Sequence, residues 1–103
     1  MFELIFHPDA EAEILALKGP MQAKALHALS KLEADGHQLR YPDTKPVKDG
    51  LFELRAGSKD ITRTFFAFSK GKKIYILRTF VKKTTKTPPS EIELALSRLE
   101  QLL

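Results

Sequence analysis

Apolar residues recur along the first part of the chain with periods typical of a strand and then of a helix. Residues 2–6 form a short apolar run that predicts a first strand, which His7 and Pro8 end. Pro8 suits the first turn of a helix, where its missing N–H leaves no hydrogen bond unmade, and the acidic residues after it complement the positive helix end. We expect the apolar face of this helix to consist of Ile14, Leu15 and Leu17.

A second helix is expected to open at Pro20, after the break at Gly19. Gly36 is suited to end it, because glycine adopts left-handed backbone conformations at little steric cost. The two helices, joined through Gly-Pro, form a predicted helical hairpin. The apolar positions of the second helix recur every three to four residues, at Met21, Ala25, Leu29 and Leu32.

Three further strands and one helix are predicted in the second half. Residues 37–50 contain two prolines and end in Asp-Gly, which predicts an ordered loop. The strands are Leu51–Ala56, residues 61–69 and Lys73–Val81, and residues 69–72 make a tight hairpin turn between the last two. A capping box at residues 90–93 opens the final helix. Its apolar side is Ile92, Leu96, Leu99 and Leu103.

This order of elements predicts one α+β domain that spans residues 1–103. It consists of an N-terminal strand, a two-helix hairpin, a three-stranded antiparallel continuation of the sheet and a C-terminal helix. A hydrophobic content of 43% is near the norm for a globular protein. We expect the helices to pack on one face of an antiparallel sheet.

Several features favour a soluble protein of the cytoplasm. The chain has no cysteine, which excludes disulfides and thiolate metal sites. Its first residues lack the basic segment and the longer apolar run of a signal peptide. No stretch approaches the roughly 20 apolar residues of a membrane span, so we expect no membrane association.

Positive charge is concentrated in the middle of the chain. Residues 37–87 hold 13 Lys+Arg and 4 Asp+Glu, a local net charge of +9, whereas the flanks hold 4 and 9, a charge of −5. A surface made only for solubility mixes the signs more evenly. The pattern favours one face that binds a polyanion, the alternative being a chance clustering of charge on loops.

Three predicted strands each carry an arginine. Arg55 is in register with Leu51 and Glu53 on the side of its strand opposite Phe52 and Leu54. Arg63 lies in the most apolar strand, so it either pairs with Glu53 or Asp60 or faces an open groove. Together with Arg78, these side chains form a concave basic patch suited to phosphate, or each pairs with a carboxylate near it.

Lysines follow the last strand. The run Lys82, Lys83 and Lys86 lies between a strand and a capped helix, where anchored lysines bind phosphates or donate protons. The three histidines are isolated from one another in the sequence, and no motif of paired carboxylates, glycine-rich phosphate loop or metal ligands occurs. We therefore expect no metal and no cofactor, and any nuclease chemistry would rely on side chains alone.

Four sequence blocks stand in order in the second half of the chain. They are Leu-Phe-Glu-Leu-Arg at 51–55, Arg-Thr-Phe-Phe-Ala-Phe at 63–68, the Lys-Ile strand from 73, and Phe-Val-Lys-Lys-Thr-Thr-Lys-Thr-Pro at 80–88. With these blocks the chain resembles the RelE/ParE toxin superfamily, most closely its phage-derived HigB-like branch. The resemblance covers nearly the whole chain, including the opening strand and the helical hairpin.

The resemblance implies the toxin of a type II toxin–antitoxin system with a RelE-like fold. Such a toxin is an endoribonuclease that needs no metal and cuts messenger RNA on the ribosome, and its implied partner is a helix-turn-helix antitoxin. Carried over by motif, Arg55 and Arg63 stabilise the phosphate and the transition state. Lys82 and Lys83 are phosphate ligands or proton donors. The expected RNA-binding residues are Arg78, Lys86, Lys45 and Lys48.

The sequence also departs from that family. RelE-type members carry extra lysines in the first of the three later strands and a tyrosine near the chain end, whereas this strand has Glu53 and the tyrosines are Tyr41 and Tyr75. The resemblance therefore does not assign the general acid and base. Two alternatives stay open: a ParE-like inhibitor of DNA gyrase without nuclease activity, and a basic nucleic-acid-binding domain without catalysis.

Overall fold

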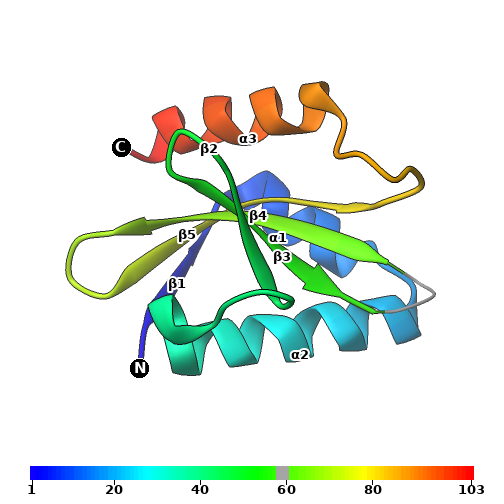
Figure 1. Ribbon diagram of the computed structural model, residues 1–103, viewed down its shortest axis with the longest axis horizontal. Coiled ribbons are helices and arrows are strands. Elements are labelled where there is room, and N and C mark those ends of the chain that lie inside the picture. Colours follow the sequence, from blue (N-terminus) through cyan, green and yellow to red (C-terminus); the bar gives the residue numbers. More distant parts are fainter. Residues whose placement is uncertain (58–60) are drawn as a thin grey trace.

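The computed structural model describes residues 1–57 and 61–103, which fold into one five-stranded mixed sheet with helices on both faces (Figure 1). The strand order is β1-β5-β4-β3-β2, and β1 runs parallel to β5 while the other neighbours are antiparallel. The elements are β1 (Glu3–Phe6), α1 (Pro8–Leu15), α2 (Gly19–Asp35), the short 3-10 helix η1 (Gly36–Gln38), β2 (Thr44–Lys48), β3 (Leu51–Ala56), β4 (Thr62–Ser69), β5 (Lys73–Val81) and α3 (Pro89–Leu102).

The sheet separates two hydrophobic clusters. On one face α1 and α2 cover β3, β4 and β5, and the cluster includes Ile14, Leu32 and Phe66. On the other face α3 packs against the same strands through Ala95, Phe65 and Leu77. The expectation that all helices pack on one face is therefore wrong. The central strands need two covers because the neighbouring rings Phe65 and Phe66 of β4 are buried in opposite clusters, so both sides of this strand carry apolar side chains.

The α+β class and most of the element order are confirmed, with one strand added. β2 lies within residues 37–50, which we expected to be a loop, and pairs antiparallel with β3 at the edge of the sheet. Pro46 is compatible with this strand because an edge strand can leave one row of backbone groups unpaired. The parallel pairing of β1 with β5 also differs from the purely antiparallel sheet that we expected.

Smaller differences concern the helix ends and faces. α2 begins at Gly19, and α3 begins at Pro89 without a side-chain cap, so the predicted capping box does not form. Leu15 is 68% exposed and Leu103 is 83% exposed, and Leu102 packs on the α3 cluster in place of Leu103. The alternation of β3 is confirmed: Leu51 lies on the α3 face, and Phe52, Leu54 and Ala56 lie on the opposite face.

Gly36 ends α2 at a place where no other residue fits well. Its φ is +53°, and a Cβ added there would overlap the ring of Phe2. We expect Gly36→Ala to lower the free energy of unfolding by about 2 kcal/mol, through positive-φ strain and the displacement of Phe2. Gly71→Ala is the matched control, because φ is +73° there but nothing lies within 4 Å. Thermal unfolding checks this, and equal losses of stability in the two variants would contradict the role of Phe2.

Candidate functional site

Four of the predicted basic residues line one pocket on the α3 side of the sheet. Its volume is about 340 Å³, and it lies between β2, β3 and the segment that joins β5 to α3. Glu53 is the one carboxylate among the described residues that line it. We call this the basic pocket, and its cations are Lys45, Arg55, Lys82 and Lys86.

Strand pairing brings these side chains together. Lys45 on β2 is the register partner of Glu53 on β3, and Arg55 on β3 is the register partner of Arg63 on β4. Lys82 follows β5 directly, and its backbone N–H donates to the carbonyl of Ile61 at 2.9 Å, so it stays in line with the sheet. Cations from well-separated parts of the chain therefore meet at one end of the strands.

A buried ion pair forms the base of the site. Arg63 is 4% exposed and Glu53 is 5% exposed, and Arg63 Nε lies 3.1 Å from Glu53 Oε2. The two atoms are not aligned as a hydrogen bond, and in the part of the chain that the structure describes neither has another hydrogen-bonding partner. Arg63 Nη1 donates to the carbonyl of Thr62 at 3.1 Å. Buried polar atoms left in this state are uncommon and often belong to functional sites.

The cations of the site repel one another. Burial and then the nearby charge of Arg55 lower the pKa of Arg63, and Glu53 opposes that change. Burial and then the charge of Arg63 lower the pKa of Lys82 below the ordinary value of 10.5. A lysine with a lowered pKa gives up its proton more readily, so this environment suits Lys82 to proton donation.

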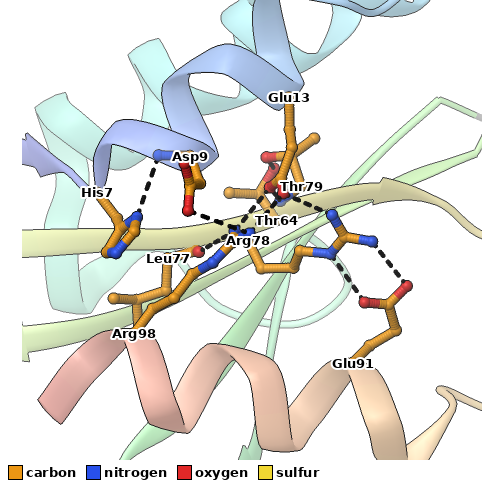
Figure 2. A network of polar contacts seen from close by, with 9 residues as sticks. All are labelled: His7, Asp9, Glu13, Thr64, Leu77, Arg78, Thr79, Glu91 and Arg98. Carbon is orange, nitrogen blue, oxygen red and sulfur yellow. Dashed lines mark hydrogen bonds and ion pairs between the residues drawn. The ribbon is translucent and has the colours of Figure 1, made fainter. Parts of the chain in front are cut away.

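Arg78 does not join the basic pocket. Its guanidinium donates to both carboxylate oxygens of Glu91 at 2.8 and 3.0 Å, and to Glu13 at 2.6 Å (Figure 2). These hydrogen bonds, above all those to Glu91, raise the pKa of Arg78 against the effect of burial. Of the three strand arginines, the structure brings only Arg55 and Arg63 together within the described chain.

Two predicted lysines also lie outside the lining of the basic pocket. Lys83 is exposed in the segment after β5, and Lys48 is exposed at the end of β2 beyond a break in register. The neighbours Lys82 and Lys83, which we predicted as a functional pair, thus take different positions. Asp60, one of the two carboxylates that we considered for Arg63, lies outside the described residues.

The pairing of Arg63 with Glu53, one of the alternatives that the sequence left open, is confirmed. The alternation that placed Glu53 on the same face of its strand as Arg55 is confirmed as well, because both line the basic pocket. One feature of the site was missed. Tyr41 was not considered for the site, yet this residue is 72% exposed and its ring centroid lies 5.8 Å from the guanidinium carbon of Arg55. No local sequence motif marks Tyr41, because its position near Arg55 depends on the path of the loop before β2.

The structure also bears on metal binding and membrane insertion. Within residues 1–57 and 61–103, no three His, Asp or Glu side chains gather closely enough to hold a metal ion. Over the same residues, no helix has the length and apolar character needed to cross a membrane.

Comparison with known proteins identifies the family. No curated protein matches the chain. The family model described as "Phage derived protein Gp49-like (DUF891)" matches residues 12–100, which include the basic pocket and all three α-helices in whole or in part. The chain therefore belongs to the phage-derived Gp49-like family, whose members have the RelE/ParE-like toxin fold.

Proposed function

We propose that the chain is the toxin of a type II toxin–antitoxin system and acts as a ribosome-dependent endoribonuclease on messenger RNA, without a metal. The observation that carries this proposal is the basic pocket, where four cations surround Glu53, the carboxylate that is also the ion-pair partner of the buried Arg63. Phosphodiester cleavage needs charge stabilisation at phosphorus and two proton transfers, and this set of side chains can supply both.

The proposed reaction uses the RNA's own 2′-hydroxyl as the nucleophile. Its oxygen forms a bond to the adjacent phosphorus, and the bond from phosphorus to the 5′-oxygen breaks. Arg55 and Lys45 hold the nonbridging oxygens and stabilise the charge that develops on them, and Arg63 adds its charge from beneath. Glu53 accepts the proton of the 2′-hydroxyl, and Lys82 donates a proton to the leaving 5′-oxygen.

The proposed partners are those that the family resemblance implies, and the charges of the chain support them. Messenger RNA on the ribosome is the substrate, and the toxin acts in the cytoplasm. A helix-turn-helix antitoxin encoded beside it would neutralise it with an acidic segment, because residues 37–87 carry a local charge of +9. Such a segment would cover the basic pocket and exclude the substrate.

Primer extension on messenger RNA bound to purified ribosomes tests the nuclease. We expect the wild-type protein to produce new ends within codons when ribosomes are present, and an Arg55→Ala variant to produce none. Intact messenger RNA together with inhibited supercoiling by purified DNA gyrase would instead support the ParE-like alternative. Salt-sensitive RNA binding with neither effect would support a binding domain without catalysis.

A further inference from the structure

A larger groove adjoins the basic pocket. Its volume is about 580 Å³, and it lies between α2 and the ends of β3 and β4. In Figure 1, α2 runs beneath this end of the sheet. Arg55 lines both the groove and the basic pocket, so the two cavities adjoin at this side chain. The basic and imidazole side chains that line the groove are Lys24, His27, Lys31, Arg55 and Arg63.

Three of the side chains that line the groove lie on one face of α2. Lys24, His27 and Lys31 are spaced three and four residues apart, which places them on one face of α2. Lys24 and His27 are exposed and do not belong to the core. Of the groove's described lining residues, Asp43 alone is a carboxylate, and its Oδ1 already accepts a hydrogen bond from Lys31 at 2.8 Å. The groove therefore has an excess of positive charge.

An exposed aromatic ring stands beside the junction of the two cavities. Tyr41 lies against the guanidinium of Arg55, and the next residue, Pro42, lines the groove. An exposed tyrosine ring next to an arginine is a common platform on which proteins stack an unpaired nucleic-acid base. Tyr41 itself lines a neighbouring cavity and reaches the two basic cavities only through its contact with Arg55.

We propose that this groove binds the single-stranded RNA that flanks the scissile phosphate. One base stacks on Tyr41, and the next phosphates lie along Lys24 and His27. The proposal rests on the proposed nuclease function and extends its substrate site beyond the bond that is cut. A single-stranded sugar-phosphate chain fits better than an acidic peptide, because an exposed tyrosine ring lies 5.8 Å from Arg55, the cation that lines both cavities.

Binding of a twelve-nucleotide RNA with 2′-O-methyl groups tests the groove, because this probe cannot be cleaved. We expect the double variant Lys24→Ala with His27→Ala to bind it about 10-fold more weakly, measured by fluorescence anisotropy. The slope of log affinity against log salt should become shallower by about 0.7 for each phosphate that the variant no longer neutralises. Tyr41→Ala should also weaken binding by roughly 10-fold, and Tyr41→Phe should restore it, since the ring is retained.

Lys18→Ala is the control, because Lys18 is exposed at the start of α2 and lines neither cavity. Circular dichroism checks that each variant is folded. Wild-type affinity and salt slope in the double variant would overturn the proposal, as would an absence of RNA binding by the wild-type protein. A loss of antitoxin binding with RNA binding unchanged would also overturn it and would assign the groove to a protein partner.

The RNA-binding role of the groove and the nuclease activity can be tested separately. If the wild-type protein binds the probe through Lys24 and Tyr41 but leaves ribosomal messenger RNA intact, the proposed nuclease function is wrong and the proposed RNA-binding groove is supported. A wild-type protein that cuts messenger RNA, with probe binding unaffected by the double variant, would overturn the groove alone.

Discussion

Replacing Lys82 by alanine is expected to lower the rate of messenger RNA cleavage on ribosomes by about 10²–10³-fold. Lys82 lines the basic pocket, and burial and the charge of Arg63 hold its pKa below the ordinary value. The variant removes the proposed proton donor to the 5′-oxygen and one of the charges that face the phosphate. Single-turnover cleavage measures the effect on chemistry. The substrate affinity should change less than the rate, because the other cations of the pocket still bind RNA.

The neighbouring residue provides a matched control for this experiment. Lys83→Ala removes the same charge one position along the chain, but Lys83 is exposed and does not line the basic pocket. We expect this variant to keep a cleavage rate within a few-fold of wild type and to keep its growth arrest in cells. A rate loss of equal size in both variants would show that only the general charge of the segment matters. Full activity of Lys82→Ala would contradict its assignment as the proton donor.

The basic pocket was predictable in part because strand alternation is a strong constraint. Alternation placed Arg55 and Glu53 on one side of β3, and the structure puts both in the lining of the pocket. The position of Lys82 followed from its place at the end of the last strand. Arg78 has the same kind of sequence environment as Arg63, but its side chain pairs with Glu91 and with Glu13, which lies 65 positions earlier. Local patterns do not contain that information.

The limits of the fold prediction have physical reasons of the same kind. β2 is polar and contains Pro46, so its sequence lacks the signal of a buried strand, and it is stabilised by pairing with β3. β1 runs parallel to β5 because of the path that the two helices take between the first strand and the rest of the sheet, and no pattern of residues predicts that path. The burial of both faces of the sheet has a signal in the sequence, since residues 65–68 are all apolar and do not alternate with polar residues.

Glu13 joins three elements that are far apart in the sequence. Its carboxylate accepts hydrogen bonds from Arg98 Nη1 and Nη2 at 2.9 and 2.8 Å, from Arg78 at 2.6 Å and from the backbone N–H of Thr79 at 3.1 Å (Figure 2). It thereby connects α1, β5 and α3. Arg98 is 8% exposed and also donates to the carbonyl of Leu77 at 2.9 Å. Glu13 thus contacts two guanidinium groups, of which that of Arg98 is buried and that of Arg78 also pairs with Glu91.

We expect Glu13→Ala to lower the free energy of unfolding by about 3 kcal/mol, because it leaves the buried charge of Arg98 without its closest carboxylate. Glu13 itself is one-fifth exposed, so the loss should be at the low end of the range for buried pairs. In a domain of this size it corresponds to a fall in Tm of roughly 12–20 °C. Denaturant and thermal unfolding measure the change. Glu11→Ala is the control, since Glu11 lies on the same helix with its side chain exposed.

The stabilisation by Glu13 should also disappear in acid. Burial acts to raise the pKa of Glu13, but the hydrogen bonds from Arg98, Thr79 and Arg78 outweigh it and hold the pKa below 4.5. A carboxylate whose pKa is lower in the folded state stabilises the fold fully above its unfolded pKa, and this stabilisation is lost as the pH falls through the folded value. The difference in unfolding free energy between wild type and Glu13→Gln should therefore be constant near neutral pH and decrease below about pH 4.5. A difference that grows on acidification would show that these hydrogen bonds do not favour the ionised carboxylate.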